Sequence, residues 1–161
     1  MQTFLISNKF EETANILDNK RLGKQILECS QILKIYLRKL NILEDGKKGY
    51  INHPVTNIWQ DIEGNVYLFQ LLKYTDCMYE EWKKRYGIRP KWEITRQEIL
   101  DFLNSHTTLI GHPKAILYWS DEFYELMKRN LIRKNPLIYS PLFPNLLETQ
   151  GYLYEHCKTI L

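Results

Sequence analysis

The stretch DNKRLGKQILECSQILKIYLRKLNIL, residues Asp18 to Leu43, decides the fold. Apolar residues recur in it every three or four positions, which is typical of the buried stripe of an amphipathic helix. This stripe consists of Leu22, Ile26, Cys29, Leu33, Tyr36, Leu40 and Leu43. The spacing predicts a long helix that begins near Asp18 and ends near Leu43.

A second face of the same helix is polar and carries Arg21, Lys24, Gln25 and Glu28. One interpretation is a solvated helix face, on which Lys24 and Glu28 form an i,i+4 pair worth about 0.2–0.5 kcal/mol. The other is a site that holds a phosphate backbone beside a carboxylate that moves protons. Spacing and charge alone favour the solvated face.

The rest of the chain also has helical patterns, and none of it predicts a sheet. We expect helices over residues 8–17 (capped by Ser7 or Asn8), from Pro54, and over 65–85, 95–104 and 114–132. Thr95 and Glu98 form a capping-box pattern, and Gly87 is a helix stop. The sequence therefore predicts an all-α fold of five to seven helices in one domain, residues 1–161. It also predicts an extended N-terminus and a Pro-rich C-terminal tail, whose Tyr139, Leu142 and Phe143 wrap onto the helices.

Composition excludes several classes of protein. Three cysteines at 29, 77 and 157 and four histidines show no metal-ligand spacing, so we expect no metal and no cofactor. No apolar run approaches the roughly 18 residues of a membrane span, and we expect a cytoplasmic or nuclear protein without a membrane partner. The formal net charge of +3 does not by itself indicate nucleic acid.

Basic residues gather in three places. One group contains Lys20, Arg21 and Lys24, and a second lies at 129–134, with Arg129, Arg133 and Lys134. The first two could bind phosphates, in which case binding would depend strongly on salt. The third comprises Lys83, Lys84, Arg85, Arg89 and Lys91, and its simplest interpretation is a solvated surface.

Several motifs occur together in a fixed order. The chain opens with MQTFL, followed by LDNKRLGKQ at 17–25 with Glu28, then GYINHP at 49–54. Near the end come LIRKNP at 131–136, Tyr139 and PLFP at 141–144. In these segments the sequence resembles the bacterial and viral family of pyrimidine-dimer DNA glycosylases.

The resemblance implies a compact helical fold and a DNA substrate that is damaged or abasic. It implies cleavage of the glycosidic bond of a damaged pyrimidine, followed by strand scission at the abasic site. The nucleophile would be the chain's own α-amine, which forms a Schiff base without a metal: that of Met1, or of Gln2 if Met1 is removed. Lys20-Arg21 stands where the phage-type enzymes carry an Arg-Glu pair, so either Asp18 or Glu28 would be the acid/base.

The same resemblance implies roles for the remaining polar residues. Phosphates would be bound by Lys20, Arg21, Lys24, Arg133 and Lys134. The sugar or base would be oriented by Gln25, Asn52 and His53. His53 and Asn52 also have an ordinary interpretation as helix-start residues satisfied by the backbone.

Two alternatives to a DNA glycosylase with lyase activity stay open at this stage. The first is a non-catalytic nucleic-acid-binding module that has kept the fold and the basic surface, which the missing Arg-Glu pair favours. The second is a nuclease or glycosylase that acts on RNA or on modified nucleotides. A covalent adduct with abasic DNA would separate the leading hypothesis from both.

Overall fold

The computed structural model describes residues 3–47, 53–110 and 114–146. These residues form one helical domain, and the predicted all-α class is confirmed. The helices are α1 (Phe10–Ile16), α2 (Asn19–Lys39), α3 (Pro54–Asn57), α4 (Leu68–Tyr86), α5 (Pro90–Ser105), α6 (Thr107–Ile110), α7 (Asp121–Lys134) and α8 (Pro136–Tyr139). In the described part of the chain, β structure is limited to an isolated bridge between Gln60 and Val66.

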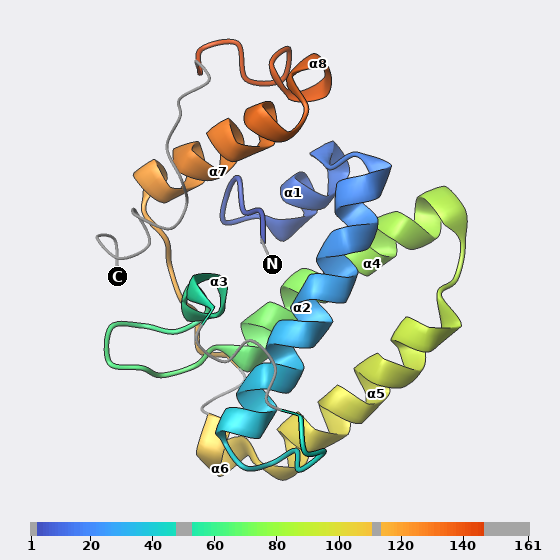
Figure 1. Ribbon diagram of the computed structural model, residues 1–161, viewed down its shortest axis with the longest axis vertical. Helices are drawn as coiled ribbons and strands as arrows, with labels where there is room; N and C mark the ends of the chain where they lie inside the picture. The colour runs from blue at the N-terminus through green and yellow to red at the C-terminus, as the bar shows by residue number, and fades with distance from the viewer. Residues whose placement is uncertain (1–2, 48–52, 111–113, 147–161) are drawn as a thin grey trace.

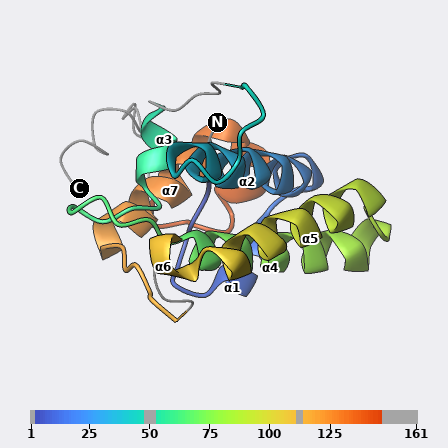
Figure 2. The same cartoon turned by 90° about the horizontal axis from the view of Figure 1, so that it is seen from below.

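The fold is organised around α2, as the sequence predicted. Figure 1 shows α2 crossing the middle of the molecule, with α4 behind it, α5 beside it and α7 and α8 at one end. Helix α2 packs mainly on α4, and α1 also packs on α4. Seen from below, α2 and α3 lie in an upper layer and α1 and α4 in a lower one (Figure 2).

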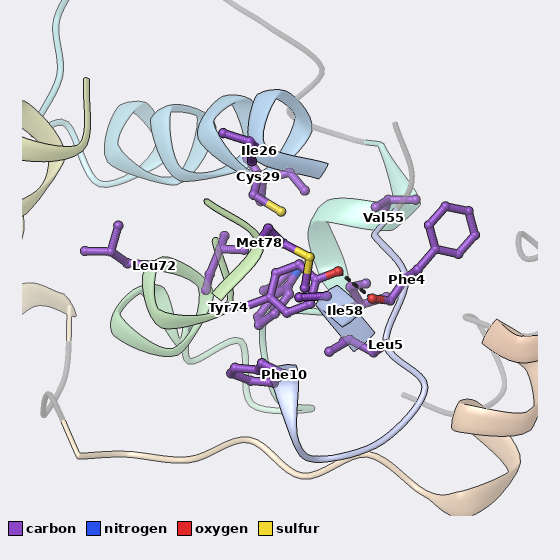
Figure 3. Close-up of a cluster of buried hydrophobic side chains, with 14 of the residues drawn as sticks. Phe4, Leu5, Phe10, Ile26, Cys29, Val55, Ile58, Leu72, Tyr74 and Met78 are labelled. Carbon is purple, nitrogen blue, oxygen red and sulfur yellow. Dashed lines mark hydrogen bonds between the residues drawn. The ribbon is translucent and has the colours of Figure 1, made fainter. Parts of the chain in front are cut away.

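The core contains an aromatic cluster around Tyr74 of α4. The Tyr74 ring lies 5.3 Å from the ring of Phe10 and 5.3 Å from that of Trp59, centroid to centroid, both within the 4.5–7 Å range of favourable aromatic pairs. Residues 3–6 are extended and buried, as predicted, and Figure 3 shows Phe4 and Leu5 beside this cluster. The start of the chain is therefore part of the core.

Gly23 lets α2 and α4 approach each other closely. A Cβ atom at this position would lie 2.6 Å from Cζ3 of Trp82, well inside van der Waals contact. The Arg89 guanidinium stacks 3.9 Å from the Trp82 ring centroid and donates to the Gly23 carbonyl at 3.2 Å. Glycine in a helix costs about 1 kcal/mol relative to alanine. The close approach of Trp82 explains why Gly23 is nevertheless found in the first turns of α2.

Helix α2 ends at Lys39, not near Leu43. Asn41 adopts a left-handed conformation, with φ +56°. The Ile42 N–H donates to the Leu37 carbonyl at 2.8 Å and the Asn41 N–H to that of Arg38 at 3.0 Å. These two bonds make a Schellman motif, which satisfies the last carbonyls and stops the helix.

Two other predicted helix starts are wrong. Helix α5 begins at Pro90 and not at Thr95, because proline suits the first helical turn and Trp92 in that turn is buried. Helix α7 begins after Ser120 and not at Lys114. The side chain of Gln70 binds both the N–H and the carbonyl of Leu117, and these bonds hold that segment outside any helix.

The ends of the chain's shorter segments also differ from expectation. The predicted cap of α1 by Ser7 or Asn8 is wrong, since α1 begins after Lys9, whose N–H donates to Oγ of Ser7. Residues 107–110, expected as loop, form α6. In the tail, Tyr139 is buried as predicted, but Leu142 is 48% exposed.

Candidate active site and nucleic-acid interface

The start of the chain is tied to α2 by a buried amide. Gln25 is 1% exposed, and its Oε1 accepts the Phe4 N–H at 3.0 Å. The Tyr74 hydroxyl lies 3.0 Å from the same oxygen and also donates to the Phe4 carbonyl, the contact dashed in Figure 3. Thr3, next to Phe4, is fully buried. These contacts fix the backbone just after the first two residues.

Glu28 lies one turn further along α2 and is also buried. It is 5% exposed, and Nζ of Lys24 approaches its Oε1 at 3.5 Å, so the predicted i,i+4 pair is present. The solvated face that spacing and charge alone favoured is wrong for Gln25 and Glu28, because both are buried, Gln25 in contact with Phe4 and Tyr74. A carboxylate in such a place keeps its charge only at the cost of desolvation, which nearby cations offset.

The first turn of α2 is held by a polar network around Asp18. Asp18 caps the helix, accepting the Arg21 N–H at 3.0 Å on Oδ1. Its Oδ2 accepts from Arg21 Nη1 at 2.6 Å and from the Tyr139 hydroxyl at 2.8 Å. Burial raises the pKa of this carboxyl, but the bonds from Arg21 and Tyr139 outweigh it, and the net shift is downward. Asp18 is a fully engaged structural anion.

Arg21 connects this network to the end of α7. Its Nη2 donates to the Lys134 carbonyl at 2.7 Å, so two of its nitrogens bind the protein itself. Only 15% of the Arg21 side chain is exposed. Arg21 therefore links α2 to α7 through hydrogen bonds. The cations beside it are more exposed and are more accessible to a ligand.

Those cations are Lys24 from α2 and Arg133 and Lys134 from the last turn of α7. The Lys24 side chain is 62% exposed, and Lys134 is also exposed. The pKa of Lys134 is lowered, first by partial burial and then by the positive charges of Arg133, Lys24 and Arg21. Positive charges from two helices therefore act on Lys134, with the Glu28 carboxylate acting in the opposite direction, and this group of cations is a candidate surface for an anion.

His53 stands at the start of α3, beside Glu28. Its Nδ1 accepts the Val55 N–H at 3.2 Å, which is the helix-cap role that the sequence allowed. This bond assigns the ring proton to Nε2. Partial burial lowers the pKa of His53, whereas the Glu28 carboxylate acts in the opposite direction. The neutral imidazole is therefore favoured near pH 7.

The predicted site residues fall into two sets. The structure brings seven of them together at the N-terminal half of α2 and the end of α7: Asp18, Arg21, Lys24, Gln25, Glu28, Arg133 and Lys134. His53 joins them from α3, and Lys20 is exposed on the first turn of α2. Met1, Gln2 and Asn52 lie outside the described residues.

The comparison with protein families gives a match over residues 1–94, more than half of the 161-residue chain, to the family described as "Pyrimidine dimer DNA glycosylase". The chain belongs to this family. Membership supports DNA glycosylase activity on pyrimidine dimers in general, with DNA as the substrate and a role in DNA repair. No curated protein and no solved structure gives a significant match.

The matched region covers only part of the cationic cluster. It includes the first residues of the chain, Gln25, Glu28 and His53, whereas Arg133, Lys134 and Tyr139 lie beyond residue 94. The second half of the chain therefore contributes cations and a hydroxyl to a cluster whose carboxylates come from the first half. Within the described segments, no group of three or more His, Cys, Asp or Glu could hold a metal ion, and no helix is long and apolar enough to cross a membrane.

Sequence reasoning missed Tyr74 and Tyr139, the two hydroxyls that organise this site. Tyr74 lies within the helix predicted over 65–85, Tyr139 was expected to wrap onto the helices from the tail, and both are buried. Their hydroxyls need hydrogen-bond partners inside the protein, and those partners are Gln25 and Asp18. The available signal was the excess of tyrosine, eleven in all, in a chain with buried polar residues.

Proposed function

We propose that this protein is a DNA glycosylase with abasic-site lyase activity, in which the α-amine of the chain is the nucleophile and Glu28 is the acid/base. The observation that carries the proposal is the bond from the Phe4 N–H to Oε1 of Gln25. It attaches the start of the chain to the helical turn that carries Glu28.

The reach of the chain supports this assignment. Two residues of fully extended chain span at most about 7 Å, so the α-amine cannot lie further than that from the buried Thr3. Gln25 and Glu28 are three residues apart on α2, and such pairs have Cβ atoms about 5–6 Å apart. An amine within this radius can share one sugar with the Glu28 carboxylate.

The surrounding charge favours the chemistry. An α-amine has an ordinary pKa of about 7.7–8.0, so a substantial fraction of it is neutral and nucleophilic near neutral pH. Lys24, Arg133 and Lys134 would bind the phosphates that flank the damaged nucleotide.

The proposed reaction needs the chain, the DNA and water. The amine lone pair forms a bond to C1′, and the C1′–N1 bond breaks with its electron pair leaving on the pyrimidine, which takes up a proton from water. The nitrogen loses a proton, and the C1′–O4′ bond then breaks with its electron pair going to O4′, which Glu28 protonates, so that an iminium forms at C1′. The Glu28 carboxylate removes a C2′ proton, the 3′ phosphate leaves with the electron pair of its C3′–O bond, and water finally hydrolyses the imine.

Glu28 is preferred to Asp18 as the acid/base for a physical reason. Both oxygens of Asp18 already accept hydrogen bonds from Arg21 or Tyr139. A general base must be able to take up a proton, and the lowered pKa of Asp18 opposes that. In this proposal Asp18 and Arg21 are positioning residues, Gln25 orients the chain start, and His53 and Asn52 contact the sugar or base.

Borohydride trapping tests the proposal. The purified protein is incubated with a duplex that contains one abasic site and then with borohydride, and adducts are counted on a denaturing gel. We expect a covalent adduct with the native protein and none after selective acetylation of the α-amine. Salt-sensitive DNA binding without an adduct would overturn the proposal and favour a non-catalytic binding module, and cleavage of RNA alone would favour a nuclease.

A further inference from the structure

The most exposed large apolar side chain in the described residues is Leu137, at 91%. It lies in α8, three residues after Lys134, and its neighbours Ile138 and Leu142 are 41% and 48% exposed. Isolated exposed apolar residues are ordinary on protein surfaces, but three in one short segment bordered by prolines are not.

The segment is held firmly against the candidate site. Tyr139 of α8 is fully buried, and its hydroxyl donates to Asp18 Oδ2 while accepting the Asp18 N–H at 3.0 Å. The Tyr139 N–H donates to the Asn135 carbonyl, and the Ser140 N–H to that of Pro136, both at 3.0 Å. Leu137 is therefore an apolar tip on an anchored turn.

The positive charges near Leu137 favour a polyanion as its binding partner. Arg133 and Lys134 end α7, one residue before α8, and the Lys134 carbonyl accepts from Arg21 at 2.7 Å. The charges of Arg133, Lys24 and Arg21 act on Lys134, which lies three residues before Leu137 in the chain. An apolar side chain near such cations suits duplex DNA, whose phosphates bind the cations while its base steps accept an apolar wedge.

We propose that Leu137 is a wedge that enters the base stack next to the lesion and helps to kink the duplex; this rests on the proposed function. Separating one base step costs a few kcal/mol, and a rigidly held apolar side chain recovers part of that cost by filling the gap. Single-stranded DNA lacks the paired, continuous stack of a duplex, so loss of the wedge should affect duplex substrates and leave single-stranded ones unchanged.

The test compares Leu137→Ala with the native protein and with Leu137→Met, which keeps a wedge of similar volume. Ile62→Ala is the matched control, since Ile62 is 85% exposed in the turn that precedes α4. Each variant is assayed by borohydride trapping on duplex and on single-stranded abasic DNA. Unstacking is followed by 2-aminopurine fluorescence beside an uncleavable tetrahydrofuran abasic analogue.

We expect Leu137→Ala to lower the duplex trapping rate about 10-fold or more and to abolish the 2-aminopurine increase, with the single-strand rate unchanged. Leu137→Met and Ile62→Ala should behave like the native protein. Equal duplex rates for Leu137→Ala and the native protein would overturn the wedge. Absence of trapping by every protein on both DNAs would instead contradict the proposed function, while fluorescence would still report on Leu137.

Discussion

The ends of α4 and α7 both carry adjacent cations, and the two ends differ in the charges that surround those cations. At the end of α4, Lys83 pairs with Glu80 at 2.7 Å, and Arg85 pairs with Glu81 at 2.7 Å. At the end of α7, Lys134 is repelled by the charges of Arg133, Lys24 and Arg21 and attracted by that of Glu28. The pKa of Lys83 is raised by its bond to Glu80, whereas that of Lys134 is lowered.

The difference shows that a basic run in a sequence does not identify a binding surface. The end of α4 carries its own carboxylates one turn earlier, and Arg85 also satisfies carbonyls at the end of α1. At the end of α7, the charges of Lys24 and Arg21, from a distant part of the chain, act on Lys134 together with those of Arg133 and Glu28. This gathering of cations depends on tertiary structure, and we expect an anion to bind there.

The largest expected effect is on catalysis. Glu28→Gln should lower the rate of strand cleavage at an abasic site about 10²–10⁴-fold, because the amide cannot take up a proton. The matched change at the α4 end, Glu81→Gln, should leave the rate near the native value. Single-turnover cleavage assays, with DNA affinity measured in parallel, check both. Equal rates for Glu28→Gln and the native protein would remove Glu28 from the mechanism.

Salt dependence of DNA binding gives the next largest contrast. Replacing both Arg133 and Lys134 by alanine should lower the slope of log affinity against log salt by about 0.9 for each lost phosphate contact. Replacing Lys83 and Lys84 by alanine removes the same charge and should leave that slope unchanged. Fluorescence anisotropy with a labelled duplex at several salt concentrations measures it. Identical losses in the two double variants would mean that the two helix ends bind DNA equally.

Asp18 should contribute stability that depends on pH. Its folded pKa is lowered from the ordinary value of 3.8, so the folded state releases the proton more readily than the unfolded chain. The stabilisation is therefore present above pH 3.8 and is lost as pH falls through the folded pKa. Asp18→Asn, which keeps a helix cap, should cost about 1–2 kcal/mol at pH 7 and progressively less in acid.

Urea unfolding from pH 7 down to the acid limit of the native fold measures this difference. A destabilisation by Asp18→Asn that stayed constant across the range would show that the carboxylate charge is not responsible. The cleavage rate of the same variant at pH 7 should fall far less than that of Glu28→Gln, because Asp18 positions other residues and takes up no proton.

The smallest expected effect is on stability: two lysine variants should change the free energy of unfolding in opposite directions. Lys134→Gln removes a charge that its neighbours repel and should raise the free energy of unfolding by a few tenths of a kcal/mol. Lys83→Gln removes a charge that Glu80 attracts and should lower it. Paired urea titrations at low ionic strength are the measurement. The same sign in both variants would contradict the distinction between the two helix ends.

Local signals in the sequence predicted much of the helical framework. The spacing from Leu22 to Tyr36 fixed the buried stripe of α2, and Gly87 ended α4 with φ +83°. Asp18 was expected just before the helix and is its cap. In each of these cases the residue and its cause lie within a turn of one another.

What the sequence could not predict depends on partners far along the chain. Gln25 and Glu28 have the spacing of a polar face, and only the contacts with Phe4 and Tyr74 show that this face is covered. Thr95 and Glu98 have the sequence of a capping box, but Thr95 lies inside α5, because the helix already begins at Pro90 with Trp92 buried in its first turn. Pairwise contacts over 21 to 121 residues decide the site, and no local pattern encodes them.

The measurement that tests the central claim most directly is the position of the trapped bond on the chain. The adduct formed with abasic DNA and borohydride is digested, and the modified peptide is identified by mass spectrometry. We predict that the added mass lies on the first residue of the mature chain, Met1 or Gln2. A modification on the ε-amine of Lys24 or Lys134 would contradict the account, since a lysine and not the chain start would then be the nucleophile.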